Sequence, residues 1–329
     1  MFKHGQKLSQ LRTIQLLHTQ SFSTQQPPQP PKSLYDKIDP YLRLARFQRQ
    51  IGTQLLLLPC YWGLALGAPG VLPSLKLISL FTVGAVAARS AGCVINDFTD
   101  KDIDKHVQRT QARPLTTGEL SNTQAGLFLT GLMGLSFSVL FQLPWESIKY
   151  GFMVTPVVFL YPTTKRFFPV PQAVLGTTFN SGVLIGYAAA ASMGANMSVC
   201  LPFYFGGILW TIVYDTIYAF PDREFDKKLG LKSSTITFEN NPRGILTMCS
   251  AASVALFALG GFNAGLGSLY FAGLGGVAAH FAWQMKTMDI NDAQKCSDLF
   301  MANKWLGLML FGAIIIGKWQ VAKSVKEQN

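Results

Sequence analysis

The stretch from Arg89 to Leu115 reads RSAGCVINDFTDKDIDKHVQRTQARPL, and it ends a long apolar run with regularly spaced acidic residues. Three of these are Asp97, Asp100 and Asp104. Because an α-helix returns to nearly the same face after three, four or seven residues, their carboxylates are expected to point one way and Asp102 the other. The stretch therefore predicts an apolar helix with a polar site at its end.

A second stretch, from Tyr214 to Ser234, reads YDTIYAFPDREFDKKLGLKSS and follows another apolar run. It carries three acidic residues at helical spacing: Asp215, Asp222 and Asp226. Glu224 falls on the opposite face. Pro221 removes a backbone donor and is expected to end or kink the helix, which would leave Asp222 and Asp226 on a separate short helix or loop.

Both acidic stretches predict bound cations. Clustered carboxylates repel one another and are costly beside an apolar medium, so they are expected to have cations among them. Oxygen ligands favour hard divalent ions, above all Mg²⁺, which usually completes its coordination shell with substrate phosphate.

The composition is that of a membrane protein. The chain has 329 residues, of which 49% are hydrophobic and only 14% charged, against about 25% charged in a typical soluble domain. A span needs about 20 apolar residues, and such stretches occur near 51–69, 77–95, 124–142, 147–161, 173–192, 200–219, 245–262, 266–284 and 303–321. We therefore expect an all-α integral membrane protein with about nine transmembrane helices. A soluble helical protein would need amphipathic helices to cover its core, and few are present.

The basic residues predict the topology. If the first span runs outward from the N-terminal side, the even-numbered loops contain Lys101, Lys105, Arg109, Arg113, Lys165, Arg166, Arg223, Lys227, Lys228, Lys232, Arg243, Lys286 and Lys295. The odd-numbered loops hold little beyond Lys76 and Lys149. This asymmetry places the N-terminus and both acidic stretches on the positive-inside face. Topology, together with an anionic substrate, accounts for the net charge of +11 without nucleic acid.

Residues 1–35 differ from the rest of the chain. They are basic, rich in Ser, Thr and Gln, and lack acidic residues, since the first acidic residue is Asp36. This favours a mitochondrial transit peptide followed by a Pro/Gln-rich linker, with a disordered cytosolic tail as the alternative. Residues 36–329 then form the transmembrane domain. The positive-inside face would be the matrix face of the inner membrane. The five cysteines form no CxxC pair, so neither a zinc site nor a disulfide framework is indicated.

The two acidic stretches closely resemble the aspartate-rich signatures of the UbiA superfamily of membrane prenyltransferases, and within it the 4-hydroxybenzoate polyprenyltransferases of ubiquinone biosynthesis. Further segments look like this subfamily in the same order: Ile51 to Cys60 (IGTQLLLLPC), Tyr161 to Gln172 (YPTTKRFFPVPQ), Val174 to Gly182 (VLGTTFNSG) and Cys296 through Gly307. The resemblance runs from about Tyr41 to about Lys318.

The resemblance implies a fold and a reaction. The fold is a UbiA-type helix bundle around a central cavity that opens laterally to lipid, with a polar cap on the matrix side. The reaction transfers a polyprenyl chain from polyprenyl diphosphate to the ring of 4-hydroxybenzoate, ortho to the hydroxyl at C3, and releases diphosphate. The implied environment is the lipid bilayer of the mitochondrial inner membrane, with the active site facing the matrix. Other ubiquinone-biosynthesis proteins are candidate partners, and nucleic acid is not.

The resemblance also implies roles for individual residues. The catalytic carboxylates are Asp97, Asp100, Asp104, Asp215, Asp222 and Asp226. Those matching metal ligands are Asp97, Asp100, Asp104, Asp222 and Asp226, while Asp215, deeper in its span, contacts water, substrate or the leaving proton. The expected substrate-binding residues are Arg89, Asn96, Arg109, Arg113, Lys165, Arg166, Asn180, Tyr218 and Lys232. Arg89 would lie in the cavity near the aromatic carboxylate or the acidic cluster, with a purely structural ion pair to an aspartate as the alternative. Buried packing residues are the alternative for Asn180 and Tyr218.

The chain departs from the family pattern just before its first span. Arg46 and Arg49 resemble the family's basic pair, but Gln48 stands where an acidic residue is common and Gln50 where proline is common. This weakens the case that this corner binds the aromatic acid.

Two other classes of function remain open at this stage. A sister enzyme of the superfamily, such as haem O synthase or a homogentisate or naphthoate prenyltransferase, would use the same chemistry on another acceptor. An ion or solute transporter would also place carboxylates and basic loops in a membrane. Inverted repeats would favour a transporter, but the two acidic stretches repeat in the same sense.

Overall fold

A computed structural model of the chain describes residues 33–105, 110–191 and 195–328. Its contacts divide the chain into two units, Met1–Asp39 and Pro40–Asn329. The described part of the second unit consists of helices and loops. The predicted transit peptide and linker lie almost wholly outside the described residues.

Each of the nine predicted apolar stretches overlaps most of one long helix. The helices are α3 (Ile51–Gly67), α4 (Leu75–Thr99), α7 (Asn122–Leu140), α8 (Trp145–Thr164), α9 (Pro171–Ala190), α10 (Met197–Ala219), α13 (Pro242–Asn263), α14 (Ser268–Thr287) and α15 (Ala293–Gln328). Six helices of the described chain are long and apolar enough to cross a membrane: α4, α7, α9, α10 together with the turns that follow it, α13 and α15. The prediction of an all-α membrane protein is therefore confirmed.

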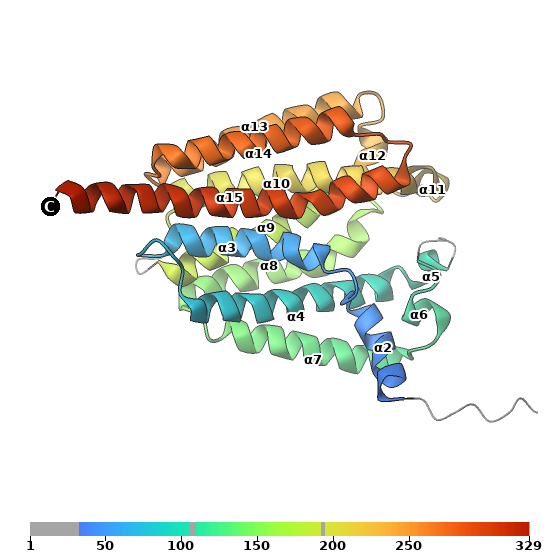
Figure 1. The fold of residues 1–329 in the computed structure, drawn as a ribbon. Coiled ribbons are helices and arrows are strands. Elements are labelled where there is room, and N and C mark those ends of the chain that lie inside the picture. Colours follow the sequence, from blue (N-terminus) through green and yellow to red (C-terminus); the bar gives the residue numbers. More distant parts are fainter. Residues whose placement is uncertain (1–32, 106–109, 192–194, 329) are drawn as a thin grey trace, which may run out of the picture. The chain divides into compact units, whose positions relative to one another are not determined.

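Short elements precede the first long helix and follow two of the others along the chain. α2 (Leu34–Leu44) precedes the first long helix, and α5 (Lys101–Asp104) and α6 (Pro114–Thr117) follow α4. The 3₁₀ turn η1 (Phe220–Asp222), α11 (Arg223–Lys228) and α12 (Ser234–Thr237) follow α10. α5, α6, α11 and α12 all lie at the same end of the bundle, as Figure 1 shows. The two acidic stretches are thereby brought to one end.

Close helix packing holds the centre of the bundle together. α3 packs along α9, where a Cβ atom on Gly63 would lie 2.3 Å from the carbonyl oxygen of Val183 and one on Gly186 would lie 2.5 Å from that of Cys60. Only glycine permits such an approach, and small residues at interfaces are how membrane helices pack without a hydrophobic driving force between them. These contacts make α3 and α9 a rigid wall.

Aromatic side chains fill the core between α3, α10, α13 and α15. The ring centroids of Trp62 and Trp210 are 5.2 Å apart, and that of Phe257 is 5.6 Å from Trp62. Both indole N–H groups are satisfied: Trp62 donates to the carbonyl of Gly307 at 2.9 Å and Trp210 donates to Asn303 Oδ1 at 2.8 Å. A buried polar group without a partner would be costly, so these bonds fix α15 against α3 and α10.

Pro221 acts as predicted. α10 ends at Ala219, the chain makes a 3₁₀ turn over Phe220–Asp222, and α11 begins at Arg223. Asp222 and Asp226 therefore lie on separate short elements. The first stretch is interrupted as well, because α4 ends at Thr99 and Asp100 separates it from α5.

Candidate active site

One cavity of about 480 Å³ is lined by both acidic stretches. Its walls come from α3, α4, α7, α8, α9 and α10, with contributions from the short elements. The acidic residues lining it are Asp97, Asp100, Asp104, Asp215, Asp222 and Asp226, which are the six predicted carboxylates. The basic residues lining it are Arg46, Arg89, Arg113, Lys165 and Arg166. Below this polar end, the lining is mainly apolar side chains of α4, α7 and α8.

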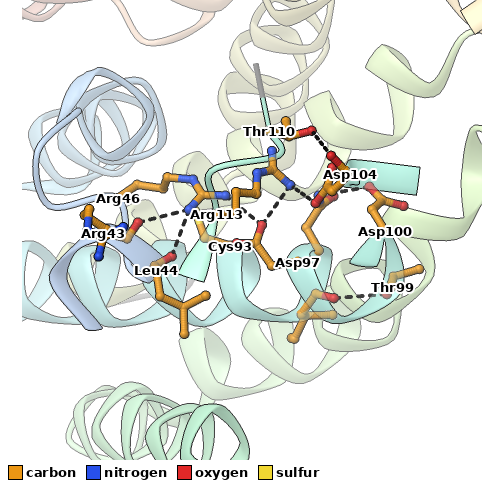
Figure 2. A network of polar contacts seen from close by, with 12 residues as sticks. Arg43, Leu44, Arg46, Cys93, Asp97, Thr99, Asp100, Asp104, Thr110 and Arg113 are labelled. Carbon is orange, nitrogen blue, oxygen red and sulfur yellow. Dashed lines mark hydrogen bonds and ion pairs between the residues drawn. The ribbon is translucent and has the colours of Figure 1, made fainter. Parts of the chain in front are cut away.

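Asp97 lies at the centre of a polar network at the end of α4 (Figure 2). Its side chain is 1% exposed, and Oδ1 lies 2.6 Å from Nη2 of Arg46 and 2.9 Å from Nη1 of Arg113. Nη1 of Arg113 also donates to Oδ2 of Asp104 at 2.5 Å. Arg113 therefore bridges two of the predicted metal ligands.

Asp100 and Asn96 form a second pair, one turn apart. Nδ2 of Asn96 donates to Oδ2 of Asp100 at 3.0 Å, and both residues line the cavity. Burial raises the pKa of Asp100 above its ordinary value, and the positive charge of Lys165 offsets only part of this. A raised pKa is what burial does to a carboxylate whose charge is incompletely balanced.

The second stretch faces the first across the cavity. Asp215 lies within α10, Asp222 in η1 and Asp226, which is buried, in α11. All three line the cavity. The residues assigned to the opposite faces do point away: the side chain of Asp102 is 93% exposed and pairs with Lys105, and that of Glu224 is 67% exposed.

Arg89 lines the cavity from the middle of α4, before Asp97 in the same helix. Its Nη1 lies 2.6 Å from Sγ of Cys93, and its guanidinium carbon lies 5.8 Å from the ring centroid of Phe179. Nε is buried and has no hydrogen-bond partner among the described residues. An unsatisfied buried guanidinium N–H is costly, so Arg89 retains a donor that a ligand can satisfy.

Tyr218, also predicted, lines the cavity near its polar end. Its ring stacks on Phe300 of α15, with centroids 4.4 Å apart. Phe300, which belongs to neither acidic stretch, therefore fixes the position of the Tyr218 ring.

Two predicted substrate-binding residues, Asn180 and Lys232, do not line the described cavity. Asn180 is fully buried between α9 and α10, where Nδ2 donates to the carbonyl of Gly176 and to Thr211 Oγ1, both at 2.9 Å. Its neighbours Phe179 and Ser181 line the cavity, whereas Asn180 does not. The Lys232 side chain is exposed, and only its backbone N–H approaches the site, donating to the carbonyl of Lys165 at 2.6 Å. Arg109 lies outside the described residues.

Sequence reasoning undervalued Arg46 and overlooked Tyr161. Arg46 lines the cavity and pairs with Asp97, whereas Arg49 is exposed. The only signal for Arg46 was its match to a basic family position. Tyr161 lies in the cavity wall at the end of α8, within a family-like segment that offered no sign of which residues face inward.

The acidic end fits divalent cations, although not as one three-carboxylate site. Within the described ranges no three acidic side chains converge on a single point, and Arg113 stands between Asp97 and Asp104. Oδ2 of Asp97, however, is buried without a hydrogen-bond partner in the described chain. Mg²⁺ is usually held by one or two carboxylates together with substrate phosphates. A buried carboxylate oxygen with no partner suits that role.

Comparison with known proteins agrees with this geometry. Residues 56–313 match the model of the UbiA prenyltransferase family. The chain belongs to this family. It is 43% identical over 281 residues to the mitochondrial 4-hydroxybenzoate polyprenyltransferase of Mus musculus, covering 85% of this chain and 75% of that protein.

Solved members of the family share the fold. The apo structure of a UbiA homolog from Aeropyrum pernix K1 superposes with a TM-score of 0.70 and 25% identity, covering 82% of this chain and 98% of that one. A UbiA homolog from Archaeoglobus fulgidus bound to GPP and Mg²⁺ has a TM-score of 0.60 and 19% identity, covering 84% and 99%. The helix bundle around a cavity is thus the family's fold.

Proposed function

We propose that this chain transfers a polyprenyl group from polyprenyl diphosphate to C3 of 4-hydroxybenzoate, ortho to the hydroxyl, in ubiquinone biosynthesis. The observation that carries the proposal is the single cavity with six carboxylates at one end and apolar walls below. A donor with a charged head and a lipid-like tail requires this combination. The mouse relative is named for this acceptor, and the identity of 43% extends over most of both chains.

The charges at the polar end support a divalent metal. Six carboxylates and five basic residues line the cavity, so their formal charges nearly cancel. A diphosphate adds several negative charges to a partly buried site, and this requires further cations. The structure of the A. fulgidus homolog bound to GPP and Mg²⁺ supports Mg²⁺ as that cation.

The carboxylates of both stretches would hold the metal together with the diphosphate. We assign this role to Asp97, Asp100, Asp104, Asp222 and Asp226. When bound, Mg²⁺ stabilises the negative charge that develops on the leaving diphosphate. Arg113, Lys165 and Arg166 line the cavity beside these residues and bind diphosphate oxygens. Arg109, which matches a basic family position, is assigned to the same task.

The acceptor lies deeper, where Arg89 supplies an unsatisfied N–H for its carboxylate and Tyr218 offers a ring held by Phe300. The carbon–oxygen bond of the donor breaks with its electron pair going to diphosphate. The ring carbon ortho to the hydroxyl then bonds to the allylic carbon. Loss of the ring proton restores aromaticity, and we assign Asp215, which lines the cavity, as the group that accepts it. The apolar walls exclude water, which would otherwise capture the cation as a prenyl alcohol.

The cellular setting completes the proposal. Nine membrane-crossing helices, an active site facing the matrix and a transit peptide in residues 1–35 fit the positive-inside pattern and the mitochondrial names of the relatives. Contacts with other ubiquinone-biosynthesis proteins would bring donor and product to the site.

The test uses membranes that contain the full chain. They receive labelled 4-hydroxybenzoate, a polyprenyl diphosphate and Mg²⁺, in parallel with labelled homogentisate and with haem B as acceptors. We expect a prenylated product from 4-hydroxybenzoate alone, and its formation should stop with a chelator and return with excess Mg²⁺. Product from another acceptor and none from 4-hydroxybenzoate would overturn the assignment.

A further inference from the structure

One tyrosine of the cavity wall has an unpaired hydroxyl. Tyr214 of α10 lines the cavity, and only 1% of it is exposed. Its hydroxyl is buried and has no hydrogen-bond partner in the part of the chain that the structure describes. A buried hydroxyl left unpaired costs about 1–3 kcal/mol, and a buried tyrosine usually finds a partner for its O–H. The partner of Tyr214 is therefore expected to be a molecule that enters the cavity.

The core fixes the ring of Tyr214. Its centroid lies 5.1 Å from that of Trp210 and 5.7 Å from that of Phe300, with interplanar angles of 77° and 63°. Trp210 is held in turn by its hydrogen bond to Asn303. The hydroxyl of Tyr214 thus has a position set by packing, as a group that recognises a ligand requires.

The polar side chain one turn before Tyr214 in α10 is already engaged. Oγ1 of Thr211 donates to the carbonyl of Gly207 at 3.0 Å and accepts from Nδ2 of Asn180 at 2.9 Å. Thr211 therefore has no proton left to donate to the tyrosine.

Tyr270 of α14 shows the ordinary arrangement of a buried tyrosine in this fold. It is as buried as Tyr214, but it does not line the cavity. Its hydroxyl donates to the carbonyl of Phe257 at 2.7 Å. The unpaired hydroxyl of Tyr214 is therefore associated with the cavity and not with burial alone.

Charged groups of the cavity lie near the Tyr214 hydroxyl. Arg89 and Asp215 both interact electrostatically with it, and both interact in the same way with the hydroxyl of Tyr161. All four residues line the cavity. Tyr214 therefore faces the region in which Arg89 is expected to bind the acceptor.

The acceptor carries two polar groups at opposite ends of its ring. If the proposed function is correct, on which this inference rests, the carboxylate pairs with the guanidinium of Arg89. The ring hydroxyl is neutral, and the hydroxyl of a tyrosine can both accept a hydrogen bond from it and donate one to it. A hydrogen bond donated by the ring hydroxyl also raises the electron density of the ring, which favours attack by the ortho carbon.

We propose that the Tyr214 hydroxyl binds the ring hydroxyl of the aromatic acceptor and selects acceptors that carry one. An acid without this hydroxyl, such as benzoate, leaves Tyr214 unpaired in the complex. A site built to pair with a ligand hydroxyl discriminates against analogues that lack it for this reason. Arg89 and Tyr214 then hold the two ends of the ring and determine which carbon faces the donor.

The test measures the binding of two acids to three proteins. Purified wild-type chain, Tyr214→Phe and Tyr270→Phe are saturated with Mg²⁺ and geranyl thiolodiphosphate, an unreactive analogue of the donor, and titrated with 4-hydroxybenzoate or benzoate in a calorimeter. For Tyr214→Phe we expect Kd for 4-hydroxybenzoate to rise about tenfold and Kd for benzoate to stay close to that of wild type. Tyr270→Phe should bind both acids as wild type does, because Tyr270 does not line the cavity.

Thermal unfolding of the free proteins gives a second readout. Removal of the Tyr214 hydroxyl breaks no hydrogen bond among the described residues, so Tyr214→Phe should melt at the wild-type temperature or above it. Removal of the Tyr270 hydroxyl breaks its bond to Phe257 and should lower the melting temperature. A loss of stability in Tyr214→Phe as large as that in Tyr270→Phe would show that the hydroxyl serves the fold, and would overturn the proposal.

Two binding results would also overturn it. One is an equal loss of affinity for both acids in Tyr214→Phe, and the other is an unchanged affinity for both. Turnover of 4-hydroxybenzoate with geranyl diphosphate by the wild-type chain is measured alongside. Absence of turnover would refute the proposed function, whereas turnover together with either binding result would refute only the role of Tyr214.

Discussion

Nη2 of Arg46 lies 2.6 Å from Oδ1 of Asp97, although the two residues are 51 positions apart in the chain. Arg46 makes this contact with φ of 59°, the only positive φ of a residue other than glycine in the described part of the chain. An L-residue in this region is strained, and such strain persists where the surroundings determine the conformation. Nη1 of Arg46 also donates to the carbonyl of Arg43 at 3.0 Å. The chain before α3 is thus shaped to bring one guanidinium to the first acidic stretch.

Two substitutions of Arg46 distinguish the effect of its backbone conformation from that of its side chain. Arg46→Gly and Arg46→Ala both remove the ion pair with Asp97, and both are expected to raise KM for the polyprenyl diphosphate. Alanine must still adopt the left-handed conformation, which costs about 1–2 kcal/mol, whereas glycine adopts it freely. Thermal unfolding in detergent should therefore show the alanine variant as the less stable. An alanine variant as stable as the glycine variant would contradict the strain at this position.

The acidic residues of the first stretch are expected to differ in role, because some line the cavity and Asp102 is exposed to solvent. Asp97→Asn should lower the rate by about a hundredfold or more, the size of effect seen when one stabilising group is lost from a preorganised site. Asp102→Asn is the matched control, because its side chain is 93% exposed, and it should leave the rate nearly unchanged. The measurement is initial rate at saturating Mg²⁺ and both substrates. Similar losses in the two variants would refute the assignment of faces.

Arg89 is expected to recognise the carboxylate of the aromatic acceptor. Arg89→Lys keeps the charge but loses the planar, two-pronged donor. The apparent affinity for 4-hydroxybenzoate should fall by about 1–3 kcal/mol, while that for the polyprenyl diphosphate changes little. Both constants and the melting temperature are measured on one purified variant. Unchanged constants with a lowered melting temperature would mean that Arg89 is structural.

Topology can be tested by labelling single cysteines in mitochondria. Labels near Lys105, Arg166, Lys228 and Lys295 are expected to react from the matrix side, and a label near Ser198 from the other side. The reason is that the predicted nine crossings, with the N-terminus on the matrix side, would place alternate loops on opposite faces. A label at 228 that reacts from the side opposite to one at 105 would refute both the nine crossings and a shared active site.

The pattern of apolar runs predicted the helices well because a membrane-spanning helix is encoded locally, by a run of apolar residues. Pro221 ended α10 for an equally local reason. The orientation of single polar residues was less predictable. Asn180 and its neighbour Phe179 occupy one family-like segment, but only the helix packing decides that Phe179 faces the cavity and Asn180 faces α10.

Arg46 is a second residue whose contacts could not be predicted from the sequence. Its residue type suited anion binding, yet its pairing with Asp97 depends on a backbone conformation that no sequence pattern encodes. Likewise, the spacing of Asp97 and Asp104 predicted neighbouring carboxylates but not that Arg113 would lie between them. Contacts between residues distant in sequence are set by tertiary packing, and a local pattern contains no record of them.

The bridge from Arg113 to Asp97 and Asp104 determines how tightly this protein holds a metal when no donor is present. A divalent ion that bound the paired oxygens, Oδ1 of Asp97 and Oδ2 of Asp104, would have to break these ion pairs, so its net gain in free energy would be small. A bound diphosphate would pair with the guanidinium of Arg113 once the metal has displaced it from the carboxylates. Binding of the metal and binding of the diphosphate would then favour each other. Because such coupling is reciprocal, metal and donor each raise the affinity for the other. Without a donor, Arg113 would stay paired with Asp97 and Asp104, and the complete ionic centre would assemble only around a molecule that can react.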